Sequence, residues 1–181
     1  EQKPDHREPP AFDMGAMNAR LDGPQTKLKA EVRKFCVDAG FKHNPEMPKD
    51  KQREQVLDWL KTLASSGYGT YAFPGVTSEA SFAEFVAVFD TLATADLSLT
   101  VKYGVQFGLF GGSIYFLGSD EQRQRHLPDV AAGRLLGCFA MSEFGHGSNV
   151  HDLETTAIFD AESNMLVVHT PREAARKEWI G

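Results

Sequence analysis

The spacing of apolar residues changes near residue 133, and this change constrains the fold more than any other feature of the sequence. Before it, apolar residues recur every three or four positions, as they do on one face of an α-helix. After it, the apolar segments are short and are bounded by glycine or polar residues, as β-strands are. Helices followed by strands favour an α+β fold over alternating β-α-β units.

Three amphipathic helices are expected before residue 95. Gly40 and Gly67 are expected to end the first two, and Ser78 to cap the third. The apolar positions that share a face are Leu28, Val32, Phe35, Cys36 and Ala39 in the first helix, Val56, Leu57, Leu60, Leu63 and Ala64 in the second, and Phe82, Phe85, Val86, Phe89, Leu92 and Ala93 in the third.

The segment 97–118 is apolar on nearly all sides, which predicts a helix buried by its neighbours. Each glycine in a helix costs about 1 kcal/mol relative to alanine, so close packing or a ligand must compensate for them, and packing is the simpler explanation. Ser119 is expected to cap a surface helix that follows. The glycines in question are Gly104, Gly108, Gly111 and Gly112.

Strands are expected after residue 133. Residues 134–142 have the composition of a buried strand, and residues 154–170 predict a hairpin that turns at Asp160–Asn164. In its second strand, Leu166, Val168 and Thr170 share a face.

The chain is therefore divided into an extended or flexible arm at residues 1–24, an all-α domain at 25–133 and the start of a β-domain at 134–181. The apolar ending Trp179-Ile180-Gly181 resembles a strand cut in the middle. We expect the chain to be the N-terminal part of a longer protein.

Composition excludes several classes of protein. Hydrophobic residues make up 41% of the 181 and charged residues 24%, which is ordinary globular usage. The net charge of −6, without a Lys/Arg cluster, argues against a nucleic-acid-binding module. No run of about 18 apolar residues predicts a membrane span. Cys36 and Cys138 lie in apolar segments and are expected to be buried free thiols.

The turn Gly145-His146-Gly147-Ser148 follows the predicted strand and is a candidate binding site. Glycines permit positive φ and close approach of a ligand, and successive backbone N–H groups can bind phosphate. Ser142, at the strand's end, could interact with a heterocycle. A nucleotide-type cofactor would therefore suit the site, with its pyrophosphate near the turn and its rings beyond the strand. An ordinary chain reversal is the alternative. The spacing matches neither a Rossmann fingerprint nor a nucleophile elbow.

Other chemistry at this turn is disfavoured. His146, His151 and Asp152 do not match a zinc-ligand spacing, so no metal site is predicted. A catalytic pair of Cys138 and His146 is disfavoured as well, because apolar surroundings raise a thiol pKa.

The segment GCFAMSEFGHGSNVHDLETTA, followed by HTP and KEWIG, resembles the flavin-binding region of acyl-CoA oxidases, which belong to the acyl-CoA dehydrogenase superfamily. The upstream segment FGLFGGSIYFLGSDEQRQRHLPDVAAGRLLG is similar to the same family. GHGSNV, LETTA and the ending WIG are closer to oxidases than to dehydrogenases. The resemblance covers residues 97–181, and the earlier helices match in character.

The resemblance implies FAD as cofactor and a fatty acyl-CoA as substrate, oxidised to a trans-2-enoyl-CoA while O₂ becomes hydrogen peroxide. Ser142 stands where the family has a threonine that bonds the flavin ring. Gly147 and Ser148 match the turn at the pyrophosphate, Trp179 the tryptophan beside the flavin, and Gly181 a residue near flavin N5. Phe144 and Glu178 depart from the family's common leucine and tryptophan, and the role of Glu178 stays open.

The resemblance also implies a β-barrel-like second domain, a C-terminal helical domain that these residues lack, and a homodimer at full length. The catalytic base is a glutamate in that C-terminal domain, so no residue here is predicted to be catalytic, and the chain alone is expected to bind FAD weakly and not to turn over. A bacterial source would imply the cytoplasm, and a eukaryotic source the peroxisome. The alternatives are a dehydrogenase that reduces an electron-transfer flavoprotein, and a flavin-free module that binds acyl-CoA or supports assembly.

Overall fold

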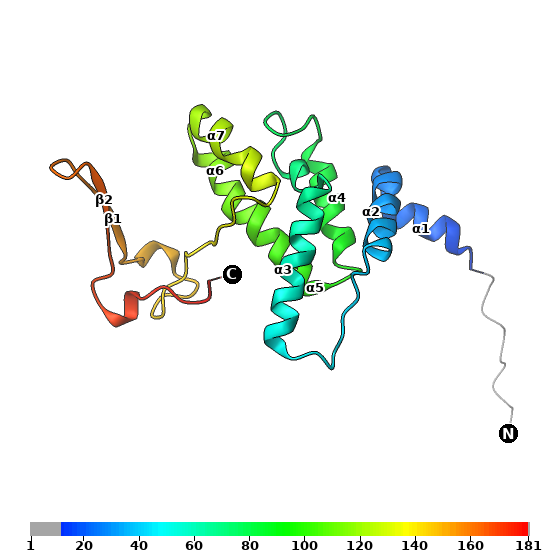
Figure 1. Ribbon diagram of the computed structural model, residues 1–181, viewed down its shortest axis with the longest axis horizontal. Coiled ribbons are helices and arrows are strands. Elements are labelled where there is room, and N and C mark those ends of the chain that lie inside the picture. Colours follow the sequence, from blue (N-terminus) through cyan, green and yellow to red (C-terminus); the bar gives the residue numbers. More distant parts are fainter. Residues whose placement is uncertain (1–11, 181) are drawn as a thin grey trace, which may run out of the picture.

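The structure is a computed structural model that describes residues 12–180, and it has seven α-helices and one two-stranded sheet in that range (Figure 1). The α-helices are α1 (Met14–Asp22), α2 (Thr26–Asp38), α3 (Lys49–Ser65), α4 (Phe82–Leu92), α5 (Leu97–Tyr103), α6 (Gly112–Leu117) and α7 (Asp120–Ala131). A π-helix, Gly104–Gly111, joins α5 to α6. The strands are β1 (Thr156–Asp160) and β2 (Met165–His169). The predicted α+β order of elements is confirmed.

The helices from α2 to α7 enclose one apolar core. The predicted faces of the first two helices supply part of it, with Val32 and Cys36 buried on α2 and Leu60 and Leu63 on α3. Gly40 and Gly67 follow these helices with positive φ, as expected for residues that end a helix. In Figure 1 this helical body lies beside residues 134–180, and the β1–β2 hairpin projects away from it.

The prediction for α4 is wrong in two respects. Its N-cap is Ser81, which forms a reciprocal capping box with Glu84, and Ser78 instead donates its hydroxyl to the carbonyl of Thr70 at 3.0 Å. Phe82 and Val86 are exposed, because the face of α4 that meets the core is rotated towards Val88 and its neighbours. Apolar residues surround this helix on more than one face, so periodicity alone could not fix its orientation.

Part of the predicted arm is helical. The Asp13 carboxylate accepts a hydrogen bond from the backbone N–H of Ala16 at 2.9 Å and caps α1, although no residue of α1 is buried. Local capping therefore overrides the expectation of an extended chain for residues 14–22. Residues 1–11 lie outside the described part of the chain.

Two of the four glycines predicted for close packing are explained by it. A Cβ atom on Gly104 would lie 2.8 Å from the Phe89 ring, and one on Gly111 would lie 2.4 Å from the Phe73 ring. Ser119 caps α7 through a capping box with Gln122, as predicted. A Cβ atom on Gly108 or Gly112 would make only ordinary contacts, at 3.8 and 3.9 Å, so helix packing accounts for Gly104 and Gly111 alone.

The hairpin prediction is confirmed, since β1 and β2 pair antiparallel from Thr156↔His169 to Asp160↔Met165. The strand predicted at 134–142 is wrong. Among the described residues, no strand lies beside this segment to complete a ladder, and it runs as irregular chain with Leu135, Leu136 and Met141 exposed. Cys138 is exposed for the same reason, whereas Cys36 is buried as expected.

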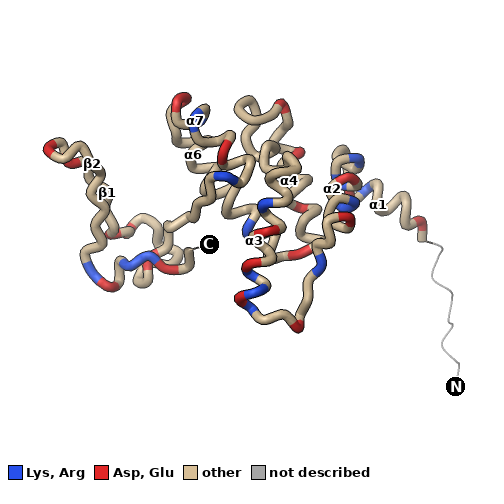
Figure 2. The backbone as a smooth tube through the Cα atoms, viewed as in Figure 1, with Lys and Arg blue, Asp and Glu red and all other residues tan. Residues whose placement is uncertain are grey.

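Acidic and basic residues are interspersed in the described part of the chain, and Figure 2 shows Lys and Arg scattered among Asp and Glu. Between residues 12 and 180, no helix combines the length and hydrophobicity that a membrane span requires.

Candidate functional site

Two segments far apart in sequence pair at the predicted cofactor turn. The backbone N–H of Glu178 donates to the carbonyl of Ser142 at 3.1 Å, and that of Phe144 donates to Arg176 at 2.9 Å. The N–H of Gly145 donates to Ala174 at 2.7 Å. The pairing brings Ser142 beside the residue that precedes Trp179.

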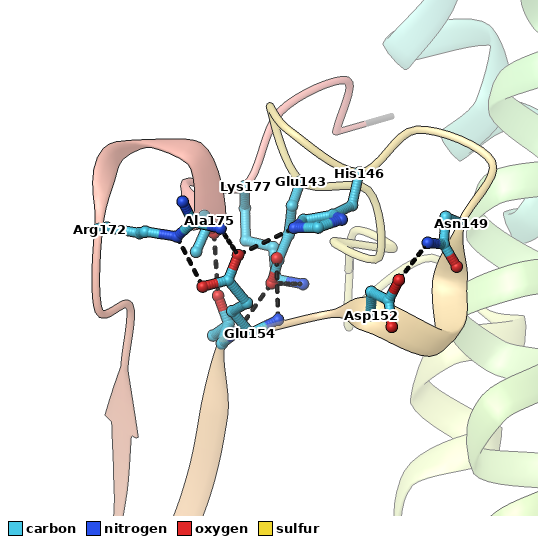
Figure 3. A network of polar contacts seen from close by, with 9 residues as sticks. Glu143, His146, Asn149, Asp152, Glu154, Arg172, Ala175 and Lys177 are labelled. Carbon is cyan, nitrogen blue, oxygen red and sulfur yellow. Dashed lines mark hydrogen bonds and ion pairs between the residues drawn. The ribbon is translucent and has the colours of Figure 1, made fainter.

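A buried carboxylate, Glu143, ties this pairing to the start of the hairpin (Figure 3). Its oxygens accept hydrogen bonds from the backbone N–H groups of Glu154 at 3.0 Å and Thr155 at 2.9 Å. The ammonium of Lys177 lies 3.1 Å from Glu143 Oε1 and donates to the carbonyl of Met141 at 2.8 Å. Burial by itself would raise the pKa of Glu143, but these hydrogen bonds outweigh it and lower the pKa to about 2.

A second carboxylate, Glu154, extends the network outwards. Arg172 donates to both of its oxygens, at 2.7 and 2.5 Å, and His146 Nε2 lies 2.9 Å from Oε1. The hydrogen bond from Arg172, followed by that with His146, lowers the pKa of Glu154 to about 2. The turn residue His146 is therefore held by the network, as Figure 3 shows.

The glycines of the turn do not act as the sequence suggested. Neither Gly145 nor Gly147 has positive φ. Gly145 serves close packing, because a Cβ atom there would lie 3.0 Å from Ala174 Cβ and 3.1 Å from its carbonyl oxygen. Gly147 faces open space, since a Cβ atom there would meet nothing within 4 Å. Only Gly147 therefore leaves backbone open to a ligand.

Among the described residues, Gly147, Ser148 and Trp179 are exposed. Within residues 12–180, the backbone N–H groups of Gly147 and Ser148 and the Ser148 hydroxyl donate no hydrogen bond. Trp179 is 85% exposed, with an unusual φ of 58°. Gly181 lies outside the described residues. Free backbone donors suit an anionic group, and an uncovered aromatic ring suits a flat apolar group.

Glu143, His146 and Glu154 bring three potential metal-ligand atoms within 4.8 Å of one another. Lys177 and Arg172 already balance the charge of the two carboxylates. The ion-pair network accounts for this cluster without a metal ion.

The sequence did not identify the Glu143 network, because its partners come from the backbone of residues 154–155 and from Lys177. It also missed an apolar groove of about 430 Å³ between α4 and the α5–π segment. Apolar residues on more than one face of the α4 segment were the signal that could have revealed it. The groove is lined by Phe85, Val86, Phe89, Val101, Gly104, Val105, Gly108 and Leu109.

Comparison with known proteins gives consistent results. The family described as acyl-CoA dehydrogenase, N-terminal domain, matches residues 23–134. Acyl-coenzyme A oxidase 2, peroxisomal, of Arabidopsis thaliana is 37% identical over 167 residues, which cover 92% of this chain and 24% of that protein. An acyl-CoA oxidase 3 structure from Yarrowia lipolytica superposes with a TM-score of 0.72 at 27% identity and covers 94% of this chain and 24% of its own.

A structure of acyl-CoA dehydrogenase complexed with FAD from Bacillus anthracis shares the fold, with a TM-score of 0.68 at 22% identity over 87% of this chain and 26% of its own. The chain thus spans about a quarter of the length of the relatives it matches.

Proposed function

Because this chain belongs to the acyl-CoA dehydrogenase family through its N-terminal domain, we propose that it is the part of an FAD-dependent acyl-CoA oxidase that binds the flavin and one side of the acyl chain. The overall reaction converts a fatty acyl-CoA and O₂ into a trans-2-enoyl-CoA and hydrogen peroxide. The relatives named acyl-coenzyme A oxidase support the oxidase over the dehydrogenase alternative. The Arabidopsis relatives named peroxisomal support a peroxisomal location.

The observation that carries the proposal is the placement of Ser142 beside the segment that ends in Trp179. Ser142 would bond the flavin ring, Trp179 would pack beside it, and the free N–H groups of Gly147 and Ser148 would bind the pyrophosphate. Gly181 is proposed to lie near the same ring. Bound FAD would supply the acceptor for the hydride that leaves the substrate.

The apolar groove between α4 and the α5–π segment would receive the acyl chain. Its volume of about 430 Å³ falls in the range of ligand pockets, about 300–1,000 Å³. Phe85, Phe89 and Leu109 line it and would exclude water from the chain.

We also propose the division into an arm at 1–24, a helical domain at 25–133 and the start of a β-domain at 134–181. The family match, which ends at residue 134, supports the second boundary. The catalytic base is assigned to a part of the full-length protein outside these residues, because the family resemblance places it on a glutamate of a C-terminal helical domain. In this chain the carboxylates of Glu143 and Glu154 are engaged in ion pairs with Lys177 and Arg172. This chain alone would bind FAD weakly and not turn over, and the full-length enzyme would be a homodimer.

The test is the visible absorption spectrum of the full-length purified protein, followed by a peroxide assay with a fatty acyl-CoA. A bound-flavin spectrum, with peroxide formed in step with enoyl-CoA, is the expected result. Turnover only with an artificial electron acceptor would favour the dehydrogenase. A colourless protein that still binds acyl-CoA would favour the flavin-free module.

A further inference from the structure

We propose that Gln106 is a positioning residue that fixes the segment carrying Ser142 against the helical domain. Its side chain is 3% exposed and lies in the π-helix. Its Nε2 donates to the carbonyl of Leu135 at 2.8 Å, and its Oε1 accepts from the N–H of Gly137 at 3.1 Å. The inference rests on the proposed function, because Ser142 is assigned there to the flavin ring.

The two bonds of Gln106 replace those of a neighbouring strand. A primary amide offers a donor and an acceptor side by side. Leu135 O and Gly137 N, two residues apart, are a pair of groups that a strand would present to its partner. Within the described chain no strand lies beside this segment, so the buried amide of Gln106 supplies its backbone partners there.

A second contact from the same helix fixes the distance between the segment and the helix. Gly137 lies against the ring of Phe110, and a Cβ atom on Gly137 would lie 2.3 Å from ring carbons. Phe110 is partly buried and packs against the hydrophobic core. Gln106 therefore sets the position of the segment along its length, and the Phe110 ring sets its distance from the helix.

The same π-helix lines the proposed acyl groove. Val105, Gly108 and Leu109 face the groove, while Gln106 and Phe110 hold the segment 135–137. π-Helical interruptions occur frequently at functional sites. The π-helix thus lines the groove with some of its residues and with others contacts the segment 135–137. Ser142 follows Gly137 by five residues.

The experiment compares three variants of the full-length protein. Gln106→Met keeps the side-chain length and removes both bonds, and Gly137→Ala pushes the segment away from Phe110. Gln52→Met is the matched control, because it also removes a side-chain amide bond to a backbone carbonyl, that of Asn44 at 2.9 Å, on the helical domain. The readouts are the FAD dissociation constant, the visible spectrum of bound flavin, hydrogen exchange at the Gly137 amide, and the melting temperature.

We expect Gln106→Met to weaken FAD binding about tenfold, on the scale of two lost hydrogen bonds, to shift the flavin spectrum and to expose the Gly137 amide to exchange. Gly137→Ala should weaken FAD binding as well, and the double variant should be no worse than the poorer single variant, since both substitutions displace the same segment. Gln52→Met should leave the flavin readouts unchanged.

A lower melting temperature with unchanged FAD affinity and spectrum in both Gln106→Met and Gly137→Ala would overturn the positioning role and leave the proposed function intact. If Gln106→Met does not fold, Gly137→Ala alone decides by the same criterion. A wild-type protein that binds no FAD would overturn the proposed function and this role together.

Discussion

Between residues 32 and 131 the side chains excluded from solvent are mostly apolar, whereas between 134 and 180 the largest fully buried side chain is a carboxylate, that of Glu143. In the second region the other buried residue is Ala175, and both strands of the hairpin are largely exposed. A two-stranded hairpin is marginally stable alone. The helical region is thus stabilised by burial, and the region that carries the proposed flavin site by hydrogen bonds and ion pairs.

The largest expected difference is between core truncations in the two regions. Leu63→Ala removes a side chain that is 0% exposed, and we expect it to lower the free energy of unfolding by about 2–5 kcal/mol. Val168 on β2 is 71% exposed, and Val168→Ala should change the free energy of unfolding by about 0.5 kcal/mol or less. Urea unfolding followed by circular dichroism measures both. Equal losses would mean that the hairpin is buried against something in solution.

Glycines give the next largest contrast. A Cβ atom on Gly69 would lie 2.1 Å from the backbone oxygen of Ala131, which cannot rotate away, so Gly69→Ala should destabilise by about 1–3 kcal/mol. Gly147→Ala adds a methyl group to open space and should leave the melting temperature unchanged. Gly147→Ala should nevertheless weaken FAD binding in the full-length protein. A stable Gly69→Ala variant would contradict the close approach of the 3₁₀ helix Tyr68–Ala72 to α7 at Ala131.

A smaller effect, largest in residues 134–180, is expected from acid. The pKa of Glu143 falls from the ordinary 4.5 to about 2 on folding, and that of Glu154 does likewise. A depressed carboxyl pKa contributes stability that is fully present above pH 4.5 and is lost as the pH falls towards 2. Hydrogen exchange at the amides of Glu154 and Thr155 should therefore accelerate, relative to the intrinsic rate, between pH 4.5 and 2.

The matched control for acid is Glu143→Gln, which cannot ionise. Its amides at 154 and 155 should be poorly protected already at neutral pH and should depend less on pH. The helical core should keep its protection over the same pH range in both proteins. Loss of core protection in step with the network would show that the two regions unfold together.

The sequence predicted the helical region better than the second one, because amphipathic periodicity and caps are local. The ends of α2 and α3, the Ser119 cap and the hairpin at Asp160–Asn164 follow from neighbouring residues. The Ser78 cap failed because Ser81 has Glu84 three residues later and completes a capping box. Of two serines in one loop, the one that caps the helix can be identified only by its capping-box partner, here Glu84.

The site depends on contacts that sequence spacing does not encode. Gly145 is required by Ala174, about 30 positions later, and Glu143 is satisfied by backbone groups of the hairpin. The prediction of a strand at 134–142 failed because a strand needs a partner strand. In the described chain the side chain of Gln106 supplies part of the hydrogen bonding that such a partner would give. Family resemblance could name Ser142 and Trp179, but it could not predict the pairing that brings their segments together.

The smallest effect is expected from an ion pair that contributes little to the stability of the helical region. Lys34 and Asp38 form an exposed pair at 2.5 Å on α2, and Lys34→Ala should lower the free energy of unfolding by only about 0.3–0.5 kcal/mol, an effect that salt removes.

Arg172→Ala breaks the bidentate bond to Glu154 and should speed amide exchange around residues 154–155 while leaving the core unchanged. Titrating both variants with salt separates them, because the screened surface pair becomes neutral whereas the exchange difference at 154–155 persists. If Lys34→Ala cost as much as a core truncation, charge pairing would also stabilise the helical region, and the contrast between the two regions would fail.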